Sequence, residues 1–293
     1  MPQLLNTAKV LILRSGAIGD IILTFPLVLS CIELYGRDNV VCAAPGFMKP
    51  VAYLAGIDGF IDLDTCGMHR LFSADFQAEE APAVLGEYDL ILNCLTGKDD
   101  LLHEHLTLCS SHVRSITPPH NSIGMHAAEY LASLLPESAS LPEARIMPER
   151  FSVLPDNIRS LFGSGRPAAA VHPGTGSPHK LVSPDLFERL ISHHARDKTV
   201  IILTGPADRN LVPFVQNMSR TYGCPHLDSV PLAQAAYVIW RSVSYIGLDS
   251  GISHLAGMTG TPCRVIFTAT DPAVWRPYSS SVTAAGPDEM CPV

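Results

Sequence analysis

The sequence predicts two α/β domains, each a doubly wound parallel sheet with helices on both faces. Short apolar runs rich in branched residues, such as Val10–Leu13 and Ala168–His172, alternate with longer segments of helical pattern. Near-continuous apolar strands joined by helical crossovers are typical of buried parallel sheets. The 293 residues also give the chain the length of about two domains. These observations together predict a pair of Rossmann-like domains.

The predicted elements follow the same order in both halves. The first half has strands at 10–13, 40–43, 57–63, 90–94 and 113–116, with a helix over 20–35. The second half has strands at 168–172, 200–204, 243–248 and 264–267, and helices at 184–195, 207–222, 232–241 and 250–258. Prolines are frequent between 135 and 167, which predicts a linker and domains 1–150 and 151–293. We expect the domains to face each other across a cleft, with ligands at loops that follow the strands.

Composition and charge exclude several classes of protein. Hydrophobic residues make up 47% of the chain and charged residues 16%, which is typical of a globular protein. The net charge of −8 argues against nucleic-acid binding, because that function needs basic surface. Residues 1–135 hold 7 basic and 15 acidic side chains, so the whole net charge of −8 lies there. The remaining 13 basic and 13 acidic side chains cancel.

The eight cysteines and the hydropathy pattern predict a soluble cytoplasmic protein. No two cysteines form a CxxC pair, and most of them lie in apolar runs, so we expect reduced cysteines in the core. Arg14 and Asp20 interrupt the apolar N-terminal stretch, which argues against a signal peptide. No run of 18 apolar residues lacks a charge, so we expect no transmembrane helix. Peripheral association with the inner membrane surface stays open.

The first candidate loop, residues 14–20, follows the first strand. Gly16 and Gly19 allow a tight turn and a close approach of the backbone to a ligand. Asp20 then begins a helix, where aspartate is a common N-cap. A dinucleotide fingerprint is disfavoured, because one glycine of the pattern is missing and no acidic residue ends the second strand.

The second candidate loop, residues 173–180, follows the first strand of the second half. The amide of Gly176, the hydroxyls of Thr175 and Ser177 and the ammonium group of Lys180 all suit phosphate oxygens. The loop is not a P-loop, because Leu181 follows the lysine. An ordinary turn rich in glycine and proline is the alternative.

The third candidate loop stands where an apolar strand ends at Asp249. Ser250 and Gly251 would leave free N–H groups at the positive end of the next helix, a geometry that binds a diphosphate. His254 lies one turn further on the same side of that helix. A purely structural turn is the alternative. A serine-hydrolase elbow is excluded, because neither Ser250 nor Ser253 has the flanking glycines of that motif.

The order and spacing of these loops resemble the heptosyltransferase family, glycosyltransferase family 9. The matching stretches are residues 12–20, 172–177 with Lys180, 249–251 with 254–256, 261–262, and the tail 270–277. The resemblance runs over nearly the whole chain and is strong at the first loop and in the second half. It implies a GT-B fold, in which domain 1–150 binds the acceptor and domain 151–293 binds a nucleotide-sugar donor.

The resemblance also implies the reaction and the partners. Heptose would pass, with inversion, from ADP-heptose to a lipopolysaccharide core or related glycan or glycolipid acceptor, without a metal or other cofactor. Asp20 matches the general base, and Lys180 would stabilise the leaving diphosphate. The predicted donor-binding residues are Gly16, Gly19, Thr175, Gly176, Ser177, Lys180, Asp208, Asp249, Ser250, Gly251 and His254. For Asp208 a helix-start acid is the alternative to a contact with the donor ribose.

The sequence departs from the family pattern at two points, and other functions are compatible with the loops. Leu181 stands where the family often has tryptophan, and the acidic first half suits a less charged acceptor than a phosphorylated inner core. Asp62-Leu63-Asp64 and the histidines near 103 and 193 lack the context of a metal site, so no metal is expected. The alternatives are a GT-B enzyme with another donor, an epimerase, and an inactive protein that binds a nucleotide sugar.

Overall fold

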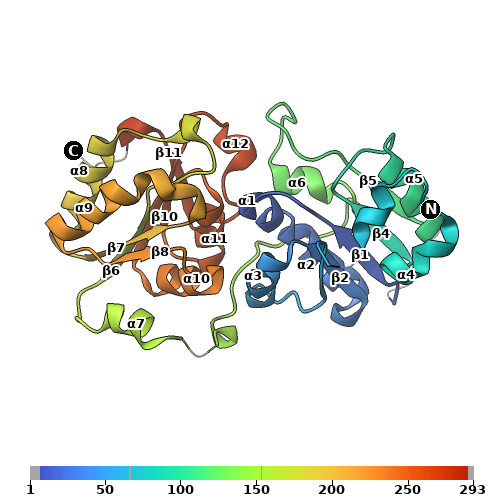
Figure 1. Cartoon of the computed structure of the whole chain (residues 1–293), viewed down its shortest axis with the longest axis horizontal. Coiled ribbons are helices and arrows are strands. Elements are labelled where there is room, and N and C mark those ends of the chain that lie inside the picture. The colour runs from blue at the N-terminus through green and yellow to red at the C-terminus, as the bar shows by residue number, and fades with distance from the viewer. Residues whose placement is uncertain (1–6, 66, 153, 290–293) are drawn as a thin grey trace. The chain divides into compact units, whose positions relative to one another are not determined.

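The computed structural model describes residues 7–65, 67–152 and 154–289 and divides into two compact units. Unit 1 is Met1–Ala144 and unit 2 is Arg145–Val293 (Figure 1). The division falls within the segment where prolines predicted a linker. Each unit contains one parallel sheet with helices, which confirms the predicted fold class.

Unit 1 has a five-stranded sheet in the order β3-β2-β1-β4-β5. Its strands are β1 Val10–Leu13, β2 Val40–Ala44, β3 Phe60–Asp62, β4 Leu90–Asn93 and β5 Val113–Ser115. All neighbouring strands are parallel, and β1 is central because Val10 pairs with Val40 on one side and Leu90 on the other. The loop after β1 therefore leaves the middle of the carboxyl edge, where open α/β sheets bind ligands.

Helices cover both faces of this sheet (Figure 1). They are α1 Ile18–Ile22, α2 Phe25–Tyr35, α3 Lys49–Leu54, α4 Ala81–Leu85, α5 Leu101–Cys109 and α6 Ala127–Ala132. On one face Leu102 and Leu106 of α5 join Leu11 and Leu13 of β1 in a buried cluster. On the other face α2 packs against β1, β2 and α6.

The single helix predicted over 20–35 is two helices in the structure. The break falls at Leu23 and Thr24, and Pro26 stands in the first turn of α2. Because proline has no N–H, it cannot continue the hydrogen-bond ladder from α1. The stretch Ile18–Tyr35 has a mean hydropathy of 1.7 and the length to cross a bilayer, yet 67% of it is buried inside the unit. This burial matches a core segment of the sheet-and-helix fold.

Unit 2 has a six-stranded sheet in the order β11-β10-β9-β6-β7-β8. Its strands are β6 Ala168–His172, β7 Thr199–Thr204, β8 His226–Asp228, β9 Ser244–Leu248, β10 Cys263–Ile266 and β11 Val282–Ala285. All pairs are parallel, and β6 lies between β7 and β9. The edge strands β8 and β11 were not among the predicted strands, because neither is a run of large apolar residues.

Two buried clusters show that helices cover both faces of the second sheet. The helices are α7 Asp156–Arg159, α8 Pro184–His194, α9 Val212–Tyr222, α10 Leu232–Arg241, α11 Gly251–Thr259 and α12 Pro272–Trp275. One cluster joins α7, α10 and α11 to the sheet, and the other joins α8 and α9 to its opposite face (Figure 1). The predicted helix 207–222 is a 3₁₀-helix, Pro206–Leu211, followed by α9.

The described cysteines behave as predicted core residues. Cys31, Cys42, Cys94, Cys109, Cys224 and Cys263 are free thiols, and all but Cys109 are buried. Burial raises the pKa of the Cys42 and Cys94 thiols to about 12, so both stay protonated and inert near neutral pH. Cys66 and Cys291 lie outside the described residues.

Candidate functional site

In unit 1, the loop after β1 holds an ion pair between a buried arginine and a partly exposed aspartate. Arg14 Nη2 lies 3.4 Å from Asp20 Oδ1, and the exposed fractions of the two side chains are 4% and 33%. Arg14 Nη1 also donates to the carbonyl oxygen of Cys94 at 2.9 Å, which anchors the guanidinium to the end of β4. The buried guanidinium thus orients the Asp20 carboxylate, which remains accessible to solvent.

Asp20 combines a helix-start role with an accessible carboxylate. Its Oδ2 accepts from the backbone N–H of Ala17 at 3.1 Å, at the start of α1. Gly16 has a φ of +129°, and a Cβ on it would lie 2.9 Å from Asp20 Oδ2, so glycine is required for this turn. Gly19 is buried in α1. The expected N-cap position of Asp20 is wrong, because α1 begins at Ile18 with Ala17 as its N-cap and Asp20 is the third residue of the helix. From there Oδ2 orders the helix start through the Ala17 amide while Oδ1 faces Arg14.

In unit 2, Lys180 and Asp249 form the reverse arrangement. Lys180 Nζ donates to Asp249 Oδ2 at 2.7 Å, and the exposed fractions of the side chains are 27% and 6%. The hydroxyl of Thr270 donates to the same oxygen, and the hydroxyl of Thr175 donates to the Asp249 carbonyl oxygen at 3.0 Å. These contacts join the loops after β6, β9 and β10. The buried carboxylate of Asp249 therefore orients the ammonium group of Lys180, which solvent can reach.

A second chain of hydrogen bonds lies at the same edge of the sheet. His172 Nε2 contacts Asp208 Oδ2 at 3.1 Å, and His172 Nδ1 contacts Ser250 Oγ at 3.2 Å. Burial raises the pKa of Asp208, but the contact with His172 and the amides of Gly205 and Thr175 outweigh it and lower that pKa below its usual range. Asp208 is therefore a carboxylate near neutral pH.

The structure gives Asp208 an inward position. Its side chain is 4% exposed, and its Oδ2 accepts from the Gly205 amide at 2.8 Å at the start of the 3₁₀-helix. A Cβ on Gly174 would lie 1.8 Å from Asp208 Oδ1, so the loop after β6 packs directly on this carboxylate. These contacts match the helix-start alternative, and the carboxylate orders two neighbouring loops.

The N-terminus of α11 presents backbone donors beside these side chains. Ser250 is the N-cap, and its Oγ accepts from the Ser253 amide at 3.4 Å. The first turn of a helix leaves N–H groups without helical partners, so Gly251 begins an anion-binding end. His254 is buried in the same helix, with 5% exposure. With nine residues, α11 is long enough for its dipole to favour an anion at the N-terminus.

The remaining predicted residues of the second loop lie at its surface. Gly176 is exposed, and no atom lies within 4 Å of a Cβ built on it. Ser177 is partly buried, and its carbonyl oxygen accepts from the Lys180 amide at 3.1 Å. The loop therefore keeps its inner residues for packing and leaves its tip accessible to a ligand.

The candidate metal ligands weighed from the sequence do not converge. Asp62 Oδ1 accepts from the Asp64 amide at 3.0 Å, which is a local turn after β3. His103 contacts Ser115 Oγ, whereas His105 contacts the Leu71 carbonyl oxygen. Within residues 7–65, 67–152 and 154–289, no three histidine, cysteine, aspartate or glutamate side chains form a group that could hold a metal ion.

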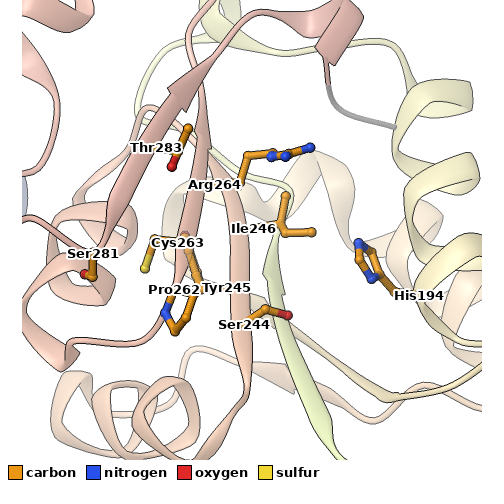
Figure 2. Close-up of a pocket in the computed structure, with 9 residues that line it drawn as sticks. All are labelled: His194, Ser244, Tyr245, Ile246, Pro262, Cys263, Arg264, Ser281 and Thr283. Atoms are coloured by element: carbon orange, nitrogen blue, oxygen red, sulfur yellow. The ribbon is translucent and has the colours of Figure 1, made fainter. Parts of the chain in front are cut away.

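A cavity of about 320 Å³ lies elsewhere in unit 2. Figure 2 shows Ser244, Arg264, Thr283 and His194 around it. These residues come from the amino-terminal parts of β9, β10 and β11 and from the end of α8. The candidate loops leave the carboxyl ends of the strands, so this cavity is not part of the site.

Three side chains that hold the candidate loops in place had no role predicted from the sequence. Arg14 and His172 each come at the end of an apolar strand, and Thr270 follows β10. The signal that could have found the first two is a charged or titratable residue at the carboxyl end of a buried strand. Thr270 carried no such signal beyond its place in the resembling tail.

Comparisons with known proteins give a family and a fold for the chain. The model of glycosyltransferase family 9 (heptosyltransferase) matches residues 119–292. Lipopolysaccharide heptosyltransferase 3 of Escherichia coli is 29% identical over 93 residues, which are 30% of this chain and only 27% of that protein.

The similar solved structures show the fold. A glycosyl transferase family 9 structure from Veillonella parvula has a TM-score of 0.73 at 15% identity, covering 97% of this chain and 88% of the other. The E. coli heptosyltransferase WaaC with ADP has a TM-score of 0.67 at 17% identity, covering 95% and 93%. TibC of enterotoxigenic E. coli, described as an iron-containing glycosyltransferase, has a TM-score of 0.58 at 12% identity, covering 94% and 64%. With a family model that matches more than half of its residues, the chain belongs to glycosyltransferase family 9, the heptosyltransferases.

Proposed function

We propose that the protein transfers a heptosyl group from ADP-heptose to a lipopolysaccharide core or related glycan, with inversion and without a metal ion. Membership of the heptosyltransferase family supports the class of reaction. The observation that carries the donor assignment is the meeting of three loops, after β6, β9 and β10, at the N-terminus of α11. A solved relative in fold is described with ADP bound, which supports adenine as the base.

The donor half of the reaction needs stabilisation of a departing diphosphate. As the bond between the anomeric carbon and the phosphate oxygen breaks, ADP leaves with the electron pair and gains negative charge. The amides after Ser250 at the start of α11 and the ammonium group of Lys180 supply positive potential where that charge develops. An ammonium group has three donors, so Lys180 can keep Asp249 and still reach a phosphate oxygen.

The acceptor half needs a base for one hydroxyl proton. We propose that Asp20 accepts this proton while the acceptor oxygen bonds to the anomeric carbon from the face opposite the diphosphate. Its 33% exposure makes the carboxylate accessible, and Arg14 keeps its orientation. This role assigns unit 1 to the acceptor and unit 2 to the donor.

The charge of unit 1 supports an acceptor with few anionic groups. Among the arginines of its described residues, Arg14, Arg37 and Arg70 are in ion pairs with carboxylates, and Arg114 donates to the Leu134 carbonyl oxygen. An arginine that already pairs with an acid offers less to a phosphate. The proposal therefore favours a weakly charged glycan or glycolipid, met in the cytoplasm or at the inner membrane surface.

Titration calorimetry with ADP, UDP and GDP tests the donor, and consumption of ADP-heptose with glycan acceptors tests the reaction. We expect tightest binding of ADP and turnover that depends on acceptor and persists in a chelator. Preference for UDP or GDP would point to another donor. Conversion of the donor without an acceptor would point to an epimerase, and binding without turnover to an inactive protein. Loss of turnover in the chelator would overturn the metal-independent assignment.

A further inference from the structure

The chain Asp208–His172–Ser250 fixes which atom of Ser250 carries a hydrogen toward the candidate diphosphate site. The side chains of Asp208 and His172 are each 4% exposed, so water competes little for their contacts. Ser250 is only partly buried and caps α11. The hydrogen-bonded chain therefore has a buried end at Asp208 and an accessible end at Ser250.

With a neutral imidazole, the chain has one consistent direction. Asp208 is a carboxylate and only accepts, so His172 Nε2 must carry the hydrogen that faces it. A neutral imidazole has one N–H, so Nδ1 is then bare and accepts from the Ser250 hydroxyl. In this state Ser250 turns only lone pairs toward the site, which repel an anion.

Protonation of the imidazole reverses the last bond of the chain. Both ring nitrogens then donate, Nε2 to Asp208 and Nδ1 to Ser250 Oγ. The Ser250 hydroxyl hydrogen is released and can be donated to a phosphate oxygen, while Oγ still accepts from the Ser253 amide.

The other ionisable groups near the chain keep their roles in both states. Tyr245 of β9 contacts Ser253 Oγ at 2.9 Å, and burial raises its pKa far above the usual range, so it stays neutral. Lys180 and Asp249 are paired with each other. On the β7 side, the Thr204 hydroxyl contacts His226 and Asp228, which forms a separate set of bonds.

We propose that binding of a nucleoside diphosphate at α11 is coupled to uptake of one proton by His172, with Ser250 as the side chain that converts this proton into a hydrogen bond to the ligand. Asp208 is the positioning residue that enforces the coupling, because its carboxylate excludes the tautomer with hydrogen on Nδ1 alone. The inference rests on the proposed function, since it requires that unit 2 bind the diphosphate.

Calorimetry of ADP binding in two buffers with different heats of ionisation measures the coupling. At about pH 8 the terminal phosphate of ADP, with a pKa of about 6, is already ionised. We expect the apparent enthalpies to differ between the buffers by the heat of roughly one proton per ADP, in the direction of uptake. Equal heats in both buffers would overturn the inference while leaving ADP binding, and so the proposed function, intact.

Asp208→Asn is the sharpest variant. The Gly205 amide donates to the same oxygen that faces His172 Nε2, so the asparagine keeps its carbonyl oxygen at that place, and only the negative charge is lost. We expect ADP to bind with a smaller proton uptake, because a neutral amide does not favour a charged imidazole as a carboxylate does, whereas a merely structural Asp208 would weaken binding and leave the uptake unchanged. His172→Gln removes the titrating ring, and we expect it to abolish the uptake. Undiminished uptake in a folded variant of either kind contradicts the inference.

His226→Gln is the matched control, because this histidine also contacts a hydroxyl at the carboxyl edge of the same sheet. We expect its proton uptake to equal that of the wild type, and loss of uptake here would assign the titration to the wrong histidine. Thermal melting of each variant checks the fold. Absence of ADP binding by the wild-type protein would refute the proposed function itself and this inference with it.

Discussion

Each unit places an ion pair at the carboxyl edge of its sheet, and the two pairs have opposite polarity. The pair of unit 1 lies in the loop after β1, and the pair of unit 2 joins the loops after β6 and β9. In unit 1 the cation, Arg14, is 4% exposed and the anion, Asp20, is 33% exposed. In unit 2 the anion, Asp249, is 6% exposed and the cation, Lys180, is 27% exposed. The carboxyl edge of the same type of sheet therefore offers an accessible carboxylate in one unit and an accessible ammonium group in the other.

This difference shows how one architecture supports two chemical tasks. The buried member of each pair fixes the accessible member and compensates part of its charge. A buried ion must be paired, so each ion pair needs both residues even if only one meets a ligand. We therefore expect the largest loss of turnover when the accessible residue of a pair, Asp20 or Lys180, is replaced. Substitutions of the buried residues around the loops should change the stability of the fold and its dependence on pH.

The largest effect is expected for Asp20→Asn. The amide cannot accept the acceptor proton, so kcat should fall by about 10²- to 10⁴-fold. ADP affinity should stay unchanged, because Lys180 and the amides of α11, which are proposed to bind the diphosphate, are in unit 2. Turnover assays and ADP calorimetry on a protein with wild-type melting behaviour would measure this. A near-normal kcat would contradict the role of Asp20 as the general base, and with it the functional contrast between the two ion pairs.

Lys180→Met tests the opposite polarity in unit 2. Loss of a donor that stabilises a leaving group should lower kcat/KM by about 10²- to 10³-fold, and ADP should bind more weakly. The control is Lys198→Met, which removes an ammonium group that pairs with the 68% exposed Asp197. Equal losses in the two variants would indicate a general effect of charge and contradict a specific role for Lys180.

Gly174→Ala tests the packing beneath the second loop. The new Cβ would meet Asp208 Oδ1 at 1.8 Å, so the free energy of unfolding should fall by about 1–3 kcal/mol. Gly176→Ala, two residues along the same loop, has open space and should change stability by less than about 0.5 kcal/mol. Chemical denaturation of both variants gives the comparison, and similar values would show that the loop does not pack on Asp208 as described.

The smallest effect concerns acid stability. The folded-state pKa of Asp208 is lowered, so its stabilising contribution is complete above the ordinary value of 3.8 and is lost as the pH falls through the folded value. Asp208→Asn removes this titration. Between about pH 5 and pH 3, we expect the melting temperature of the wild type to fall more steeply than that of the variant. Parallel slopes would mean that Asp208 is not stabilised as a carboxylate in the folded protein.

Much of the fold followed from local pattern, and the misses have physical causes. The core strands and α10 were predicted closely, because buried parallel strands are apolar throughout and α10 is strongly amphipathic. The edge strands β8 and β11 were missed, because edge positions do not require large apolar residues. The helix breaks before α2 and α9 depend on Pro26 and Pro213 in their first turns.

The candidate site divides in the same way. Asp20, Lys180 and Asp249 were found because their loops have recognisable residue types and spacing after strands. Their pairing was not predicted, because Lys180 and Asp249 are 69 residues apart in the chain and no local pattern encodes a contact over that distance. Arg14 stands within the first candidate loop, yet its burial against Cys94 depends on strand order.

The sequence by itself determined the class of fold, the family resemblance, and which loops bear polar groups, because these depend on periodicity and on short motifs. Only the tertiary structure decided which charge in each pair is buried, and that Asp208 turns inward to His172 while His172 reaches Ser250. Burial and hydrogen-bond direction are properties of atoms brought together from distant strands. The opposite polarity of the two loops is therefore a property of the assembled sheets.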